Sequence, residues 1–423
     1  MNLNSTPNSN RYTIGLFGQI NAGKSSLINA LTGEEIAITS PSPGTTTDPV
    51  TKAMELLPIG PILLIDTPGI DDFGELGRKR VSFAYKALKR CDIVLLVIDA
   101  SLQPDINKYA ELISKINDER IPVIVVYNKC DLGITVDDSS DRAIKNLTSI
   151  IDRYIPRNSN VDSQIPVIMT DAISGKGIPE LKNALINEWR RLSGEKSSKL
   201  LNGLVDSGDV ILLVTPIDEG APKGRLILPQ QQVIREILDV GATCLVTKNT
   251  EIKQALANLA GLPDLVITDS QVFSEVNASI PSEVPLTSFS IIFAKAKGDL
   301  HKYVDGISTL KSLRPGDRVL ISESCTHHVQ CNDIGRFKIP KVLSKLCEGL
   351  ELNWSSGKDF PENLSSYKLI VHCGACMLNR QEMQRRIRAA DEESVHITNY
   401  GMLLAFSSGI LPRALMPFGL NFD

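Results

Sequence analysis

The sequence predicts an α/β protein built from three domains. Short apolar, β-branched runs alternate with segments whose apolar residues recur at helical spacing, as in open sheets covered by helices. A chain of 423 residues is also too long for one ordinary hydrophobic core. The polar stretch Ser193–Lys199 interrupts the periodicity and indicates a linker. We place the domains at residues 11–195, 208–262 and 264–410.

Composition restricts the functions to consider. An apolar content of 42% and a charged content of 22% are typical of soluble globular proteins. We find no apolar run long enough to span a membrane and no signal peptide, so we expect a cytoplasmic protein with no membrane partner. The net charge of −4 argues against a nucleic-acid partner. Eight cysteines without a secretory leader indicate metal binding rather than a disulfide framework.

The first domain begins with an apolar strand, Tyr12–Phe17, that leads directly into the loop Gly18–Ser25. This is the G-x-x-x-x-G-K-S phosphate-binding pattern in its strand–loop–helix context. The glycines let backbone N–H groups surround phosphates, Lys24 is expected to contact the β- and γ-phosphate oxygens, and the Ser25 hydroxyl is expected to bind Mg²⁺. The predicted nucleotide-binding residues here are Gly18, Asn21, Ala22, Gly23, Lys24, Ser25 and Ser26.

A second strand end supplies the predicted catalytic acid. The apolar run Leu63–Asp66 ends in a carboxylate, so Asp66 is expected to hold Mg²⁺ through water, and the Gly69 amide is expected to meet the γ-phosphate. Ile70 stands where Ras-like enzymes place the glutamine that orients the attacking water. Because an aliphatic side chain cannot do this, we expect slow hydrolysis.

A third strand end identifies the base. The buried strand Val123–Tyr127 leads into Asn128, Lys129 and Asp131. The Asp131 carboxylate can accept both N1–H and N2–H₂ of guanine, which adenine cannot supply, so the predicted nucleotide is GTP or GDP. These motifs resemble the G1, G3 and G4 motifs of translation-factor-type GTPases, and the resemblance implies a P-loop GTPase domain.

The resemblance also implies roles for three weaker motifs. Pro43–Asp48 matches switch I, with Thr46 as its Mg²⁺-binding threonine, although Thr47 replaces the arginine usual in related tRNA-modification GTPases. Ala172 matches the residue whose backbone contacts the base. Asn21 matches the loop asparagine that helps to bind K⁺ in potassium-activated GTPases, so K⁺ is a predicted cofactor. The alternative is a loop residue present for its turn propensity.

The middle domain, residues 208–262, is predicted to be a small αβ unit. Strand-like runs at Val210–Val214 and Thr243–Thr247 enclose a helical apolar stripe, and a second helix is predicted over Glu251–Ala260. A unit of about 55 residues has a small hydrophobic core and is only marginally stable on its own. We therefore expect this unit to pair with a copy of itself as a homodimerisation domain, and the alternative is that it packs on its neighbours in one chain.

The third domain is predicted to hold a mostly parallel, doubly wound sheet. Its expected strands are Asp264–Thr268, Ser290–Ala294, Asp317–Ser322, Lys368–Val371 and Ser394–Thr398.

Three of these strands lead into polar segments that contain metal-ligand residues. They are Cys325–His328, His372–Cys376 and Asn399–Gly401. Ligands collect at strand carboxyl ends in such sheets, so we expect the three thiols to meet at one rim. The Cys-x-x-Cys pair is also expected in a strand-to-helix turn, where backbone N–H groups and the helix dipole favour thiolates.

The residues alone leave the metal open. A full zinc pattern with two Cys-x₂-Cys pairs is absent from the sequence. Three cysteines with a weaker fourth ligand suit a [4Fe–4S] cluster with one labile iron, and they equally suit Cys₃His zinc.

The order of the motifs resembles one family closely. A P-loop GTPase domain followed by Cys-x-His (Cys325, His327) and, after a long gap, His-Cys-x-x-Cys (His372, Cys373, Cys376) is similar to the HydF family, the GTPase scaffolds of [FeFe]-hydrogenase maturation. The resemblance implies that the three cysteines bind a [4Fe–4S] cluster, making the third domain an iron–sulfur-binding domain. His327 or His372 would be the fourth ligand, or that iron would stay open.

The same resemblance implies a carrier function. Members of the family receive a transient diiron precursor from radical-SAM maturases and deliver it to the apo-[FeFe]-hydrogenase. Five other cysteines and His328 have no place in the motif; we expect Cys91, Cys130, Cys244 and Cys347 in cores, His328 in a loop, and Cys331 as a possible spare ligand.

Two other interpretations of the function remain. One is a GTPase switch with structural zinc that acts in tRNA modification or ribosome assembly, and the acidic balance weighs against it. The other is an interaction module in which bound GTP only sets the conformation.

Overall fold

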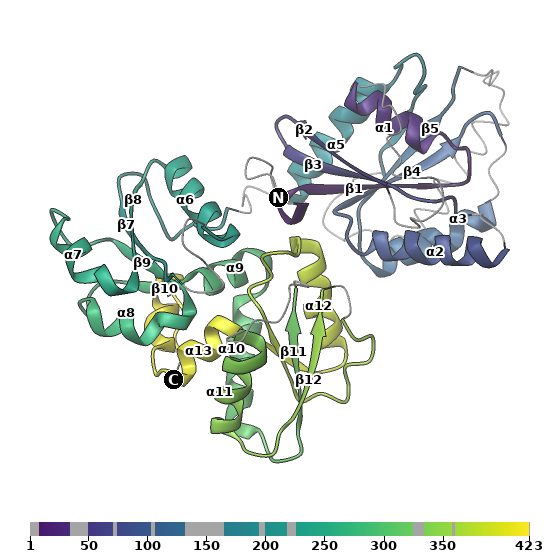
Figure 1. The fold of residues 1–423 in the computed structure, drawn as a ribbon. Helices are drawn as coiled ribbons and strands as arrows, with labels where there is room; N and C mark the ends of the chain where they lie inside the picture. Colours follow the sequence, from purple (N-terminus) through teal and green to yellow (C-terminus); the bar gives the residue numbers. More distant parts are fainter. Residues whose placement is uncertain are drawn as a thin grey trace. The chain divides into compact units, whose positions relative to one another are not determined.

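The computed structural model describes residues 8–33, 50–70, 74–102, 106–131, 165–193, 199–217, 226–324, 334–357 and 360–422. The chain divides into two compact units, Met1–Glu195 and Lys196–Asp423 (Figure 1). Among the described residues, no helix has the length and apolar character that crossing a membrane requires.

The first unit is a six-stranded sheet of order β2-β3-β1-β4-β5-β6, in which only β2 runs antiparallel to its neighbour. The central strands are buried on both faces, which explains their continuous apolar runs. The elements are β1 (Tyr12–Gly18), α1 (Lys24–Thr32), β2 (Val50–Leu56), β3 (Gly60–Asp66), α2 (Gly74–Leu88), β4 (Ile93–Asp99), α3 (Ile106–Asp118), β5 (Val123–Asn128), β6 (Val167–Met169) and α5 (Ile178–Ser193).

The second unit contains two four-stranded parallel sheets, of order β10-β9-β7-β8 and β12-β11-β13-β14. Its first sheet and the following helix comprise β7 (Val210–Val214), α6 (Leu228–Val240), β8 (Thr243–Thr247), α7 (Ile252–Ala257), β9 (Leu265–Thr268), α8 (Phe273–Ser279), β10 (Leu286–Ser288) and α9 (Phe289–Lys297). Its second sheet and the remaining helices comprise α10 (Leu300–Thr309), β11 (Arg318–Glu323), α11 (Ile339–Leu346), β12 (Glu351–Ser356), β13 (Leu369–His372), α12 (Arg380–Glu392), β14 (His396–Asn399), α13 (Tyr400–Ser407) and α14 (Leu411–Leu415).

Short irregular helices complete the chain. They are η1 (Asn8–Asn10), η2 (Asn249–Glu251), η3 (Ser270–Val272), η4 (Leu310–Ser312), the π-helix η5 (Ile334–Lys338) and η6 (Met416–Phe418). The α/β prediction is confirmed, with parallel sheets in both units.

Three expectations for the second unit require correction. The expected strand Ser290–Ala294 is part of helix α9, which Ser288 caps by accepting a hydrogen bond from the Ile291 amide. Because α9 is buried on nearly all sides, it has no amphipathic period to distinguish it from a strand. The strand expected at 264–268 exists as β9, but it pairs with β7 rather than with β11 or β13.

The third correction concerns the segment around Cys347. Helix α11 ends at Leu346, so Cys347 follows the helix, half-buried, instead of facing the core from within it. Cys91 is fully buried as expected, and Cys130 and Cys244 pack partly buried against their cores. Cys331 and His328 lie outside the described residues.

Candidate nucleotide and thiol sites

The phosphate-binding loop lies between β1 and α1, at the carboxyl edge of the first sheet. Lys24, the first residue of α1, is 7% exposed, and its ammonium donates to the carbonyl oxygens of Gly18 (3.1 Å) and Gln19 (2.7 Å). These bonds hold the cation inside the mouth of the loop, where phosphate oxygens bind in proteins with this motif.

Ser25 and Asp66 meet at the same edge. The Ser25 hydroxyl donates to Oδ2 of Asp66 at 2.5 Å, which brings together the end of β3 and the start of α1. Burial raises the pKa of Asp66, while the Ser25 hydrogen bond and the Lys24 charge oppose the rise. A hydroxyl and a carboxylate this close are the oxygen ligands that suit a hydrated Mg²⁺.

The segment after β3 also contacts the loop. The Ile70 amide donates to the Gly18 carbonyl at 3.2 Å, and the Ile70 side chain packs partly buried against the core between the sheet and α3. Gly69 therefore lies beside the phosphate-binding loop. Thr46 lies outside the described residues.

Asn128 joins the three segments of the predicted guanine pocket. It is buried at the end of β5; its Nδ2 donates to the Ala22 carbonyl (3.1 Å), and its Oδ1 accepts from the Ala172 amide (3.1 Å). Gly23 permits this approach, because a Cβ at that position would lie 2.2 Å from Asn128 Nδ2. Gly23 also has φ 88°, a left-handed conformation that favours glycine.

The neighbouring Lys129 is held by a residue that the sequence pattern did not single out. Its ammonium lies 2.6 Å from Oδ2 of Asp99, the last residue of β4. Burial raises the pKa of Asp99, but hydrogen bonds from Lys129 and Ser101 outweigh it, so the net shift is downward. The sequence signal that could have identified Asp99 is an acidic residue at the end of β4, the strand next to β5.

The remaining nucleotide-site residues lie close by in the chain. Asp131 is exposed three residues beyond the end of β5. Asn21 is exposed in the phosphate-binding loop with φ 62°, a conformation that asparagine tolerates better than most residues. Ser26 is exposed in the first turn of α1.

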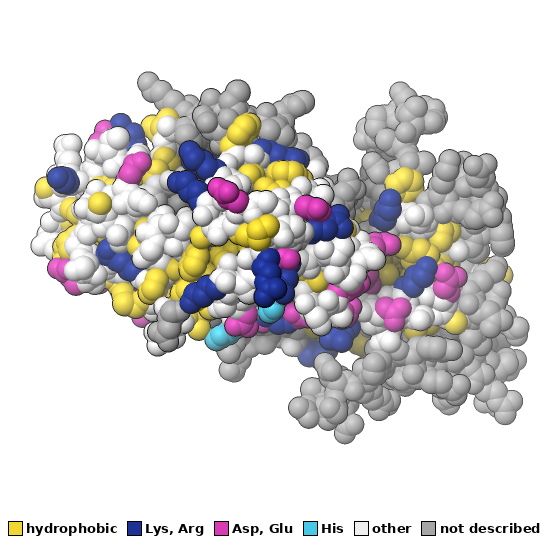
Figure 2. Space-filling model, turned by 90° about the horizontal axis from the view of Figure 1, so that it is seen from below, with side chains coloured by type: hydrophobic (Ala, Val, Ile, Leu, Met, Phe, Trp, Pro, Cys, Tyr) yellow, Lys and Arg dark blue, Asp and Glu magenta, His cyan; other side chains and the backbone are white. Residues whose placement is uncertain are grey.

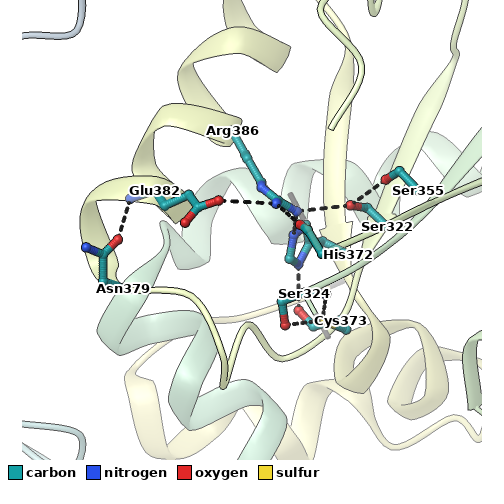
Figure 3. A network of polar contacts seen from close by, with 9 residues as sticks. Ser322, Ser324, Ser355, His372, Cys373, Asn379, Glu382 and Arg386 are labelled. Atoms are coloured by element: carbon teal, nitrogen blue, oxygen red, sulfur yellow. Dashed lines mark hydrogen bonds and ion pairs between the residues drawn. The ribbon is translucent and has the colours of Figure 1, made fainter. Parts of the chain in front are cut away.

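The thiol site lies at the carboxyl ends of β11 and β13 in the second sheet of the second unit. Cys373 directly follows β13, and its Sγ lies 3.1 Å from both the amide and the hydroxyl oxygen of Ser324 (Figure 3). Ser324 is the last described residue before Cys325, which lies outside the described residues together with His327. The strand that leads to the third cysteine therefore ends against Cys373.

The segment between β13 and α12 is a strand-to-helix turn, as expected. Cys376 lies in it, but α12 begins only at Arg380, where Asn379 caps it by accepting from the Glu382 amide. Burial, followed by the nearby Cys373, raises the pKa of the Cys376 thiol to about 11, although the Lys297 charge and then the amides of Cys376 and Met377 oppose the rise. Without metal, Cys376 is thus favoured as thiol rather than as the expected thiolate, because burial exceeds the effect of Lys297 and the amides.

The His372 ring contacts the Cys373 backbone and Arg386 in this structure. The side chain is fully buried; its Nδ1 lies 2.8 Å from the Cys373 carbonyl oxygen and its Nε2 lies 3.0 Å from Nη1 of Arg386. Burial and the Arg386 cation lower the pKa of His372 to about 3, so the ring is neutral. Both ring nitrogens are occupied, which argues against the predicted role of His372 as fourth ligand.

Arg386 is the centre of the network around His372. It is fully buried in α12 and donates to the Ser322 hydroxyl (3.3 Å) and the Gly357 carbonyl (2.6 Å). Glu382, one turn earlier, lies 3.5 Å away as its counter-charge. Figure 3 shows these side chains converging between α12 and the ends of the strands. Neither Arg386 nor Glu382 was predicted, since nothing in the sequence distinguishes Arg386 from the other arginines of α12.

The described part of the thiol site fits a metal–thiolate group. Within the described residues, no three His, Cys, Asp or Glu side chains form a metal-binding group, since Cys325 and His327 fall outside that set. Cys373 and Cys376 nevertheless come from one turn and influence each other electrostatically. A buried lysine, Lys297, lies beside this turn and its charge acts on both thiols. Thiolates are the ligands that hold iron–sulfur clusters in proteins, and nearby charge tunes the reduction potential of such a group.

Three family models match successive parts of the chain. A family model described as the hydrogen maturase F dimerization domain matches residues 200–298, and one described as the hydrogen maturase F tetramerization domain matches residues 301–417. A third, described as a 50S ribosome-binding GTPase, matches residues 13–129. The first unit is therefore a GTPase domain with the fold of that class.

Curated relatives match the GTPase domain. The tRNA modification GTPase MnmE of Nitrosomonas europaea is 33% identical over 184 residues, which cover 43% of this chain and 36% of the relative. GTPase Der of Wolinella succinogenes is 32% identical over 194 residues, covering 45% and 38%. The chain thus spans less than half the length of these relatives.

The chain also resembles a solved structure over part of its length. Translation elongation factor SelB from Methanococcus maripaludis, in complex with a GTP analogue, is 25% identical, covers 43% of this chain and 34% of its own, and superposes with a TM-score of 0.32. The two hydrogen maturase F models match the second unit and cover nearly all of it, including Cys325, Cys373 and Cys376. With its GTPase domain and the two domains that follow, the chain belongs to the hydrogen maturase F family.

Proposed function

We propose that this protein is a GTP-hydrolysing scaffold that carries a [4Fe–4S] cluster on Cys325, Cys373 and Cys376 and delivers a diiron precursor to an apo-[FeFe]-hydrogenase. Family membership supports the maturation role. The observation that carries the cluster site is the contact of Cys373 Sγ with Ser324, the residue that precedes Cys325.

The protein would supply three thiolate ligands to the cluster. Cys373 and Cys376 approach from one turn, and Cys325 follows the strand that ends against Cys373. When bound, the cluster would offer an iron atom at which the diiron cargo can attach and leave. Since His372 is bonded on both sides, the fourth position falls to His327 or to an exchangeable ligand.

The nucleotide site supports slow GTP hydrolysis. Lys24 would contact the β- and γ-phosphate oxygens, Ser25 and Thr46 would bind Mg²⁺, Asp66 would hold it through water and the Gly69 amide would meet the γ-phosphate. The Ile70 side chain packs against the core and cannot orient the attacking water. A K⁺ ion held with the help of Asn21 would add positive charge near the transferred phosphoryl group.

The binding partners that we propose also rest on family membership. We propose that the chain assembles into homo-oligomers through the second unit, as the descriptions of the two matching domains imply. Radical-SAM maturases would supply the cargo and an apo-hydrogenase would accept it. Figure 2 shows acidic and basic side chains beside one another on the described surface in that view, which does not resemble a nucleic-acid footprint.

The test is anaerobic reconstitution of the full chain with iron and sulfide, followed by metal analysis and EPR of the dithionite-reduced sample. We expect about four iron atoms per chain and a reduced-cluster signal. Both should be lost in Cys325→Ser, Cys373→Ser and Cys376→Ser, and both should persist in Cys347→Ser, the matched control. Stoichiometric zinc without such a signal would refute the proposal.

A second experiment separates the two sites. Lys24→Ala should lose GTP binding and nucleotide-dependent activation of apo-hydrogenase while keeping its iron, because Lys24 and the thiols lie in different units. Loss of iron in Lys24→Ala would show that cluster binding requires an intact GTPase domain.

A further inference from the structure

Lys297 connects α9 to the turn that carries the Cys-x-x-Cys pair. It is the last residue of α9, is 8% exposed, and lies in the stretch that matches the dimerization domain. Its ammonium donates to the carbonyl oxygens of Ala375 (3.1 Å), Cys376 (3.3 Å) and Leu378 (2.7 Å). The turn therefore wraps around a cation that is built into a different part of the chain.

The chemistry of this contact selects lysine. Three carbonyl oxygens converge on one point, and an ammonium group has three N–H donors and a full charge to satisfy them. The Phe293 ring, one turn earlier in α9, lies 5.3 Å from the same nitrogen and adds a cation–π contact. Because its donors are used by the turn, Lys297 does not act as a metal ligand or as a substrate-binding group.

The turn needs such support. Ala375 has φ 53°, a left-handed conformation that is unfavourable for a residue with a Cβ. The link also runs in the other direction, since Gln384 of α12 donates to the carbonyl oxygens of Lys297 (3.1 Å) and Gly298 (2.9 Å). The end of α9 and the thiol turn thus hold each other in place.

Charge gives Lys297 a second role. A [4Fe–4S] cluster bound by three thiolates is anionic, and its reduction adds another negative charge. A buried cation beside the turn stabilises the reduced form more than the oxidised form, and the low local dielectric strengthens the effect.

We propose that Lys297 is a positioning residue that holds the Cys373–Leu378 turn in its ligating conformation and raises the reduction potential of the bound cluster. The inference rests on the proposed cluster site. It assigns part of the electronic control of that site to a residue of the dimerization region.

The test uses three variants of the full chain. Lys297→Met removes the charge at similar length, Lys297→Arg keeps it, and Lys295→Met is the matched control, because Lys295 lies in the same helix turn but donates to Asn202. In potentiometric EPR titrations we expect Lys297→Met to show a reduced-to-oxidised ratio about tenfold lower than wild type at equal potential, a shift of about 59 mV. Lys297→Arg should stay within about threefold, and Lys295→Met should match wild type.

A metal-free measurement tests the positioning role independently. Hydrogen exchange of the amides in residues 375–379 should accelerate in Lys297→Met and remain unchanged in Lys295→Met, because only the first releases the turn. Unchanged exchange, or a Lys297→Met cluster with the wild-type potential, would overturn the inference. A wild-type protein that binds no cluster would instead refute the proposed function, and the exchange result would still decide the positioning role.

Discussion

Nε2 of His372 lies 3.0 Å from Nη1 of Arg386, and both side chains are fully buried. Because an arginine N–H can only donate, Nε2 must accept, and the proton of the neutral ring lies on Nδ1, facing the Cys373 carbonyl oxygen. This relationship fixes the orientation of the residue that precedes Cys373. In this arrangement His372 supports the thiol turn.

Arg386→Met should destabilise the second unit by about 3 kcal/mol, because it leaves Glu382 buried without its counter-charge and removes the donor to His372. The measurement is urea unfolding of the metal-free chain, followed by fluorescence of Trp354 in a Trp189→Phe background, since the chain has two tryptophans. Arg380→Met, at an exposed position of the same helix, is the control. Equal stability of the two variants would show that the network contributes little.

Gly23→Ala should abolish guanine-nucleotide binding. The added Cβ would lie 2.2 Å from Nδ2 of Asn128, which would be displaced from its bonds to Ala22 and Ala172. Gly33→Ala is the matched control, because Gly33 also has a positive φ (73°) but a Cβ there meets nothing within 4 Å. It should cost about 1 kcal/mol of stability and retain binding. Titration with a fluorescent GDP analogue measures both, and retained affinity in Gly23→Ala would contradict the described approach of Asn128.

The Asp99–Lys129 pair predicts a pH dependence of the first unit. The pKa of Asp99 is lowered in the folded state, so its contribution to stability is present above the unfolded value of about 3.9 and is lost as pH falls through the folded pKa. The difference in unfolding free energy between wild type and Asp99→Asn should be constant at about pH 5–6 and shrink below about pH 4. Trp189 fluorescence in a Trp354→Phe background measures it. A difference that grows on acidification would reverse the assigned sign.

K⁺ should accelerate GTP hydrolysis relative to Na⁺ by about a hundredfold, the usual effect of one electrostatic contact to a transition state. Asn21→Ala should remove this difference while leaving GDP affinity within a few-fold, because the exposed Asn21 side chain is expected to contact the ion rather than the base. Phosphate release under single-turnover conditions measures the rate in each salt. Equal rates in the two salts for wild type would exclude the K⁺ role.

The sequence was sufficient to predict the local features of both sites. The phosphate-binding loop between β1 and α1, the strand ends at Asp66 and Asn128, and the Cys373–Cys376 turn after β13 all lie where their patterns predict, because each depends on a few consecutive residues. The order of these motifs also led to the family that the comparisons identify.

The contacts between distant segments could be learned only from the tertiary structure. The sheet that β9 joins, the helical state of α9, the bonds of His372 to Arg386 and the reach of Lys297 into the thiol turn all depend on contacts between residues far apart in the chain. An apolar run such as 289–294 has no intrinsic preference strong enough to select helix or strand, so burial among its neighbours selects it. Short stretches of sequence therefore supply the chemical groups of this protein, while long-range packing sets how those groups are positioned.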